Sequence, residues 1–145
     1  MANNRNTVVN ALETLLATIT TANSYNTNAG ENVFQQFRTP DQVPEDEFPC
    51  FHFLNVNEVV GFYATGQRES RLTISLLAYI KSTEDETLKT DTNKLADDIV
   101  TALISSQDLG DATVDYPDEI NVDTSIIEPY GYIGVDVTYI FERNT

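Results

Sequence analysis

Two side chains of this chain, those of Cys50 and His52, could act as a nucleophile and a general base. They are its single cysteine and single histidine, and they alternate with Pro49, Phe51 and Phe53. A catalytic pair also needs a group that orients the base, commonly near a sharp strand-to-helix turn, and no such motif accompanies them. One Cys and one His cannot supply the four ligands of a zinc site. We therefore interpret both as packed strand residues and assign no catalytic or metal-binding residue.

Carboxylates are the other candidate groups, and several crowd one stretch near the C-terminus: Asp108, Asp111, Asp115, Asp118, Glu119 and Asp123. Their order does not match the Asp-x-Asp-x-Asp-Gly calcium loop, although a hard divalent cation could bridge carboxylates. Paired carboxylates for glycosidase chemistry stay open, since nothing places two of them in a shaped pocket. The six glycines form no phosphate-binding turn at a helix start. We interpret these acids as solvated surface and expect no cofactor.

The charge of the chain is strongly negative and unevenly distributed. Its 145 residues include 23 Asp and Glu against 8 Lys and Arg, a formal net charge of −15 at pH 7. After Lys94, eleven acids face Arg143 alone, so residues 95–145 carry −10 of that total. Such a surface repels the outside of a nucleic acid duplex and an anionic membrane. With no run of about 20 apolar residues, we expect a soluble protein that binds basic or neutral partners, or its own copies.

Two segments carry apolar residues at helical spacing. Residues 8–19 form the first, and residues 88–103 form the second after a run of acids. Thr83 and Glu86 have the spacing of a capping box at the start of the second helix, and Gly110 lies beyond its end. Both segments predict helices with one apolar face.

Two other segments alternate strictly, which is typical of strands with one face on a core. In residues 68–81 the core-facing set is Leu72, Ile74, Leu76, Ala78 and Ile80. In residues 131–141 it is Ile133, Val135, Val137, Tyr139 and Phe141.

Shorter β-prone runs complete the prediction. They cover residues 32–38, 50–62 and 120–128, with a further short segment at residues 112–116 and a turn at residues 64–67. Three prolines make residues 39–49 an extended surface connection. Short links between strands favour antiparallel pairing. We therefore predict one α+β domain over residues 1–145, with a largely antiparallel sheet and two amphipathic helices packed on one face.

The order of these segments resembles that of the tail terminator, or tail completion, proteins of tailed bacteriophages. The opening helix VVNALETLLATI precedes the Val33-Phe34 strand and the proline-rich connection. The long strand RLTISLLAYI, the helix KLADDIVTAL and the closing strand YIGVDVTYI follow. The resemblance covers nearly the whole chain and is one of layout and residue class.

This resemblance implies a structural virion protein that is not an enzyme. Members form a ring, typically a hexamer, that caps the tail tube and then joins it to the head-side neck. The implied partners are other copies of the chain, the tail tube protein and a neck or head-completion protein. DNA would pass through the ring without specific binding, and no membrane is involved. The expected location is the tail or neck of the virion, after assembly in the host cytoplasm.

Four residues are our candidates for contacts between subunits or with the tube. Arg68 and Arg71 form a small positive end beside the turn at residues 64–67, and Tyr130 and Tyr132 are aromatic groups suited to interfaces. The acidic stretch 108–128 has no counterpart in the family layout. We hypothesise that it gives the ring a negative lumen, to which phosphate would not stick.

Three alternatives remain open from the sequence. Another neck, head-completion or tube protein of a phage would share most of these features. A small acidic enzyme or ligand-binding domain would need a concave pocket with convergent carboxylates. An acidic inhibitor that mimics DNA would bind a basic nucleic-acid enzyme tightly and in a salt-sensitive way.

Overall fold

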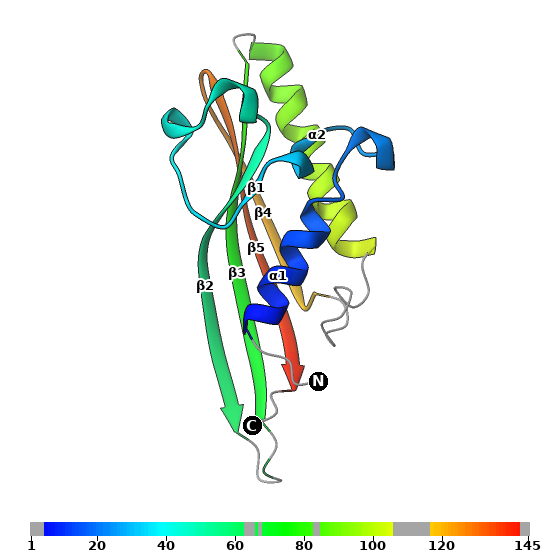
Figure 1. Ribbon diagram of the computed structural model, residues 1–145, viewed down its shortest axis with the longest axis vertical. Helices are drawn as coiled ribbons and strands as arrows, with labels where there is room; N and C mark the ends of the chain where they lie inside the picture. The colour runs from blue at the N-terminus through cyan, green and yellow to red at the C-terminus, as the bar shows by residue number, and fades with distance from the viewer. Residues whose placement is uncertain (1–4, 63–65, 67, 83–84, 106–116, 143–145) are drawn as a thin grey trace.

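The computed structural model describes residues 5–62, 66, 68–82, 85–105 and 117–142. Its helices and main strands are α1 (Arg5–Leu16), β1 (Val33–Phe34), β2 (Cys50–Phe62), β3 (Arg68–Lys81), α2 (Asp85–Ser105), β4 (Glu119–Ile127) and β5 (Tyr130–Glu142). Four short 3-10 turns, η1 to η4, lie between α1 and β2. Figure 1 shows a long, slender sheet with α2 beside its upper part and α1 beside its middle. The predicted α+β fold is confirmed.

The sheet has the strand order β1-β2-β3-β5-β4. All pairs are antiparallel except β1 with β2, which is parallel and involves only Val33 and Phe34 of β1. The sequence predicts a longer strand over residues 32–38. It ends at Phe34, where its pairing with β2 stops at His52, just before the bulge of β2 between Phe53 and Asn55. The capping box of Thr39 and Gln42, around the turn that begins at Pro40, comes five residues later.

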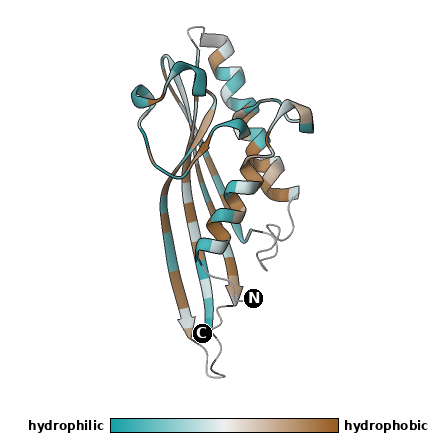
Figure 2. Ribbon diagram, in the orientation of Figure 1, coloured by the Kyte–Doolittle hydropathy of each residue, from teal (hydrophilic) through white to brown (hydrophobic). Residues whose placement is uncertain are grey.

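The alternation predicted for the two long strands is confirmed. Every residue assigned to the core face of β3 and β5 is buried, and Figure 2 shows hydrophobic and hydrophilic residues alternating along the strands. Burial of each such aliphatic side chain stabilises the fold by about 1.5–3 kcal/mol relative to exposure. Because the two strands are neighbours with a continuous register, their apolar rows form one surface on which helices can pack.

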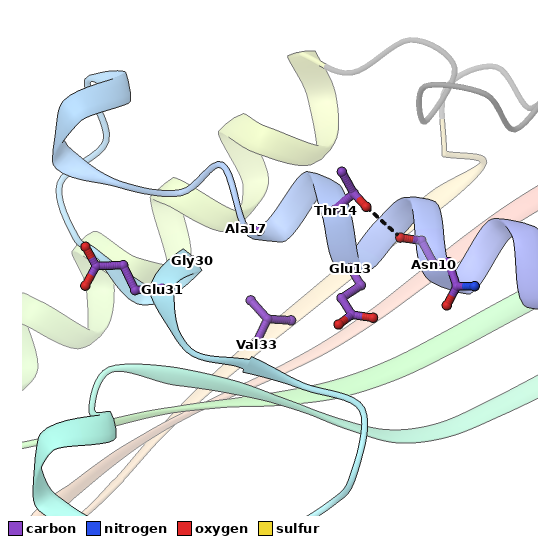
Figure 3. Close-up of a pocket in the computed structure, with 7 residues that line it drawn as sticks. All are labelled: Asn10, Glu13, Thr14, Ala17, Gly30, Glu31 and Val33. Carbon is purple, nitrogen blue, oxygen red and sulfur yellow. Dashed lines mark hydrogen bonds between the residues drawn. The ribbon is translucent and has the colours of Figure 1, made fainter.

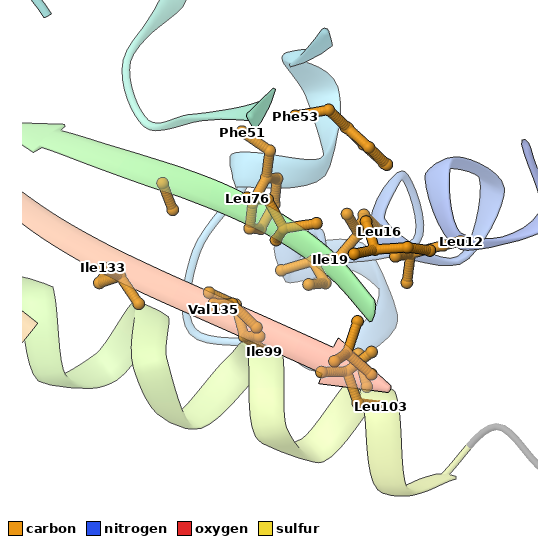
Figure 4. Close-up of a cluster of buried hydrophobic side chains, with 14 of the residues drawn as sticks. Leu12, Leu16, Ile19, Phe51, Phe53, Leu76, Ile99, Leu103, Ile133 and Val135 are labelled. Atoms are coloured by element: carbon orange, nitrogen blue, oxygen red, sulfur yellow. The ribbon is translucent and has the colours of Figure 1, made fainter. Parts of the chain in front are cut away.

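Both helices cover that surface. Leu12 and Leu16 of α1 and Ile99 and Leu103 of α2 join the same buried cluster as the core-facing residues of the sheet, and Figure 4 shows these side chains between the helices and the strands. The two helices therefore form a single layer on one face, as predicted. We call the opposite face of the sheet the uncovered face.

The first helix ends earlier than its apolar spacing predicts. It stops at Leu16, and Thr18 turns the chain by donating its hydroxyl hydrogen bond to the carbonyl oxygen of Leu15 at 2.6 Å. Ile19 is nevertheless buried, in the turn that follows. Because a Thr hydroxyl competes with the backbone for hydrogen bonds, the helix ends before the row of buried residues does.

Asp98, one of the eleven acids that follow Lys94, is not part of the exposed acidic surface. This residue of α2 is buried, and its carboxylate accepts four hydrogen bonds from the backbone and side chains of Asn26 and Thr27. The polar loop after α1, which the sequence treats as an ordinary surface connection, is thereby tied to the middle of α2.

Some sequence predictions lie outside the described residues. These are the segment at residues 112–116, the helix stop at Gly110 and the Thr83 half of the capping box. Within the predicted turn at residues 64–67, only Gly66 is described. Its φ of 81° lies in the left-handed region that glycine tolerates best.

Candidate functional site

The uncovered face is polar over the part of the sheet where no loop lies on it. By alternation with the buried rows, its central residues are Thr73 and Ser75 of β3 and Asp136 and Thr138 of β5. Ser75 donates to the Asp136 carboxylate, and the hydroxyls of Thr73 and Thr138 lie 2.9 Å apart. The outer strands add exposed residues to the same face: Asn55, Asn57, Glu119, Asn121, Asp123 and Ser125. The result is a broad surface of short polar side chains with several carboxylates.

Arg71 lies on this face and is engaged within its own chain. Its guanidinium contacts Asp118 Oδ2 at 2.8 Å and Glu119 Oε2 at 3.5 Å. The sequence predicts Arg71 to be a contact residue between subunits or with the tube. In the structure, two acids of the stretch 108–128 bind it within the same chain, at the start of β4. All three side chains keep substantial exposure, so each ion pair contributes at most about 1 kcal/mol.

Arg68 lies at the far end of the β2–β3 pair. Its guanidinium carbon sits 5.7 Å from the ring centre of Phe62, the opposing residue of β2. Phe62 is 74% exposed, an unusual state for a phenylalanine at the end of a regular strand.

Tyr130 and Tyr132 lie at the opposite end of the sheet from the two arginines, so the four candidate residues do not form one site. Both tyrosines are half-buried. Tyr132 meets Tyr79 edge to face with ring centres 5.6 Å apart, and Tyr130 stacks on Phe48 at 6.0 Å. We call this group, with Phe34 and His52, the aromatic end: residues 35–49 lie over it, and Val43, Cys50 and Tyr79 form its buried centre.

His52 and Cys50 belong to the aromatic end and are packed, as the sequence indicates. His52 is fully buried between the rings of Phe34 and Tyr79. Its Nδ1 lies 3.2 Å from the carbonyl oxygen of Gln36 and therefore carries the proton. Burial lowers the pKa of His52, and burial raises the pKa of the Cys50 thiol to about 12. A thiol that stays protonated is a poor nucleophile.

Other features offer little to a ligand within the described residues. An open hollow of about 420 Å³ lies between α1 and residues 30–33 (Figure 3), and its Glu13 already accepts a hydrogen bond from Gln35. A second, of about 450 Å³, lies beside Phe48 and Lys81. Among all the described residues, no group of three possible metal-ligating side chains occurs. No described helix is long and apolar enough to cross a membrane.

Sequence reasoning missed the apolar residues on the sheet edges. Among the described residues, β2 exposes Leu54, Val59 and Phe62, and β4 exposes Ile126 and Ile127. A signal for them existed: three apolar pairs, at residues 53–54, 59–60 and 126–127, interrupt the alternation of their strands. Since successive strand residues point to opposite faces, such a pair must place one member away from the core.

The fold defines a two-layer α+β protein whose most distinctive exposed groups lie along a polar sheet face and its edges. The chain belongs to a family described as Bacteriophage Tail Tube Terminator Protein, which matches residues 2–138. It is therefore a structural protein of the bacteriophage tail, and a component of the virion. The family is not one of enzymes.

The fold has a close counterpart among solved structures. A chain from a structure titled "Virion of native gene transfer agent (GTA) particle" superposes with a TM-score of 0.63 at 12% sequence identity. The match covers 93% of this chain and 97% of the other. At that identity the likeness establishes a shared fold. Comparison by sequence with curated proteins gives no match.

Proposed function

We propose that this protein caps the tail tube as a ring of identical copies, typically six, and joins the tube to the head-side neck. Membership of the tail tube terminator family carries this proposal. The shape of the subunit supports it, because a two-layer protein with two long edge strands can meet one neighbour on each side. The proposed partners are the tail tube protein and a neck or head-completion protein, with assembly in the host cytoplasm.

We further propose that the uncovered face lines the channel of the ring. Asp123, Asp136 and Glu119 lie on this face, and outside the aromatic end its only described base is Arg71, which is paired with acids. A wall of carboxylates and short polar groups repels phosphate, so DNA would pass without binding. The helices would then lie outside the ring.

Imaging tests the ring. Purified protein is examined by negative-stain electron microscopy alone and mixed with tail tubes. Rings that bind only at tube ends are the expected result. Long cylinders formed by the protein alone would instead indicate a tube-forming subunit, and binding to heads without tubes would indicate a head-completion protein. Either outcome contradicts tube capping.

The two ends of the sheet suggest separate roles for the candidate contact residues. Arg68 with Phe62 lies at one end, and Tyr130 with Tyr132 at the other. We propose that one end meets the tube and the other meets the neck. The variants Arg68→Ala and Tyr130→Ala should then each weaken only one of the two attachments in a pull-down with tubes or heads. Loss of both attachments in either variant would contradict separate ends.

A further inference from the structure

Exposed apolar side chains are concentrated on the two outer strands of the antiparallel sheet. Five of the seven large hydrophobic residues exposed in the described structure belong to β2 or β4. The other two are Phe37, beside the aromatic end, and Ile104, near the end of α2. Exposed apolar groups gathered on particular elements mark contact surfaces more often than scattered ones do.

These two edges lack the lysines and prolines that keep many sheet edges from pairing, although β2 has a bulge between Phe53 and Asn55 and an inward-pointing Glu58. No described strand pairs with β2 on its outer side beyond His52, and none pairs with β4 on its outer side. Proteins usually guard such edges with lysine, proline or very short strands. Here β2 has 13 residues and β4 has nine, and neither contains a lysine, an arginine or a proline.

The direction of the strands makes the two edges complementary. From β2 to β4 the sheet has four strands of alternating direction, so β2 and β4 run opposite ways. In a cyclic ring every copy has the same orientation relative to the axis. The β4 of one copy therefore meets the β2 of the next in antiparallel direction, and the alternation continues without interruption.

We propose that adjacent copies of this chain join through the β4 edge of one and the β2 edge of the next, so that the ring encloses a continuous antiparallel β-barrel. This inference rests on the proposed ring and specifies how its subunits are held together. The occupant of each edge is a second copy of the same chain.

The tilt of strands in a barrel agrees with the positions of the two edges. Strands in closed barrels tilt by about 35–45° from the barrel axis. Each copy contributes four strands, spaced about 4.8 Å apart. Across that width, the tilt shifts one copy relative to the next by about four to six residues along the strands. Within one copy, Ile120 of β4 lies in the same row as Val56 of β2. A displacement of this size toward the C-terminal end of the neighbouring β2 sets β4 beside residues 54–62, the part of β2 that β1 leaves uncovered.

The faces of the strands restrict the register further. Paired residues must lie on the same face, so only an even displacement is allowed. In either allowed register, the acids Glu119 and Asp123 lie on the uncovered face, where the open part of β2 offers Asn55, Asn57 and Val59. No two carboxylates then oppose each other across the joint. Pairing of two β4 edges would instead bring these acids near their own copies, which costs stability.

Charged substitutions test the joint with a matched control. Val59→Asp changes the β2 edge, where it would face or neighbour Asp123, and Ile127→Asp changes the β4 edge, whereas Ile104→Asp alters a helix residue with the same 58% exposure as Val59. Circular dichroism checks that each variant is folded, and light scattering measures the assembly. Each edge variant should raise the dissociation constant of the ring at least tenfold, with Ile104→Asp unchanged. Intact rings in both edge variants would overturn the proposal.

Cysteine pairs identify the strands that meet, because the natural Cys50 is buried. Asn57→Cys combined with Asp123→Cys joins copies in one allowed register, and Asn57→Cys with Ser125→Cys in the other. Oxidation by oxidised glutathione should link one double variant into a covalent ladder, with no ladder in any single variant. Dimers from Asn57→Cys alone would overturn the proposal in favour of paired β2 edges.

The outcomes separate this inference from the proposed function. Rings at tube ends with no cross-link in either double variant would keep tube capping and overturn the edge joint. A ladder with open filaments and no rings would keep the edge joint and overturn the ring. A protein that stays monomeric with and without tubes, and gives no cross-link, would overturn both.

Discussion

Thr27 donates two hydrogen bonds to one carboxylate oxygen of Asp98, from its backbone N–H at 2.9 Å and from its hydroxyl at 2.8 Å. Asn26 binds the other oxygen in the same way, with its backbone and side-chain N–H groups both at 3.0 Å. A buried carboxylate is tolerated when its oxygens accept several hydrogen bonds. This contact fastens the loop after α1 to α2 and so fixes how the two helices sit relative to each other.

Replacing Asp98 should destabilise the monomer strongly. Asp98→Ala removes all four acceptor contacts and leaves donors of Asn26 and Thr27 without a partner, for an expected loss of about 2–4 kcal/mol. The neighbouring Asp97 is exposed, so Asp97→Ala is the matched control and should change stability by less than about 0.5 kcal/mol. Urea unfolding measures both. Equal stabilities for the two variants would show that the contact has no energetic role.

A methyl group at Gly30 should be equally disruptive. A Cβ atom built there would lie 2.6–2.7 Å from the carbonyl oxygens of Leu16, Ala17 and Ile19. These are backbone atoms that cannot move aside cheaply, so we expect Gly30→Ala to cost at least about 2 kcal/mol. Gly134→Ala is the control, since its Cβ would meet only Leu77 at 3.8 Å. Thermal unfolding should show a large fall in midpoint for the first variant and a small change for the second.

His52 should make stability depend on pH. Burial lowers its pKa, the proton-accepting Nε2 has no described partner, and the nearest charges are those of Arg38 and Glu47. The unfolded chain binds a proton near the ordinary pKa of about 6.5, whereas the folded chain resists it. The contribution of neutral His52 is therefore present above about pH 6.5 and is lost as the pH falls through the folded pKa.

Urea unfolding is measured at several pH values between 7.5 and 5, because these pH values lie above the range where most carboxylates titrate. The variant His52→Phe keeps an aromatic ring between Phe34 and Tyr79 and removes the titration. Wild type should lose stability across this range by up to about 1.4 kcal/mol per pH unit, and the variant should lose less. Parallel curves for the two proteins would contradict a role for His52.

Removing the charge of Arg71 should have little effect on the monomer. Its ion pairs with Asp118 and Glu119 are largely exposed, and pairs of this kind are weakened by solvent and salt. Arg71→Gln should therefore lower stability by less than about 1 kcal/mol, and the difference should shrink further in 0.5 M salt. A larger loss that salt does not reduce would mean that Arg71 holds β4 in place by other contacts.

The regular parts of the fold could be predicted because local pattern and burial agree there. In β3 and β5 the core-facing apolar residues recur at every second position, and all of these core-facing residues are buried. In α2 the row of Leu88, Leu95 and Ile99 follows the helical period and is also buried. Short-range steric rules set the helical period and the strand period. Both periods can therefore be read from a segment's own sequence, without knowledge of its tertiary contacts. The length of β1 could not be predicted, because it depends on how far β2 pairs with it, and that pairing stops at Phe34 and His52.

The sequence by itself determined the fold class, the core rows and the family layout, since these depend on periodicity and composition. The tertiary structure decided which polar groups meet. It buried Asp98 while leaving Asp97 in solvent, and it turned Arg71 toward acids 47 and 48 positions away. It also decided that β2 and β4 would be the outer strands of the antiparallel part of the sheet, with exposed Val59 and Ile127. Pairing between distant segments follows from the closure of the whole sheet, and no local pattern contains that information.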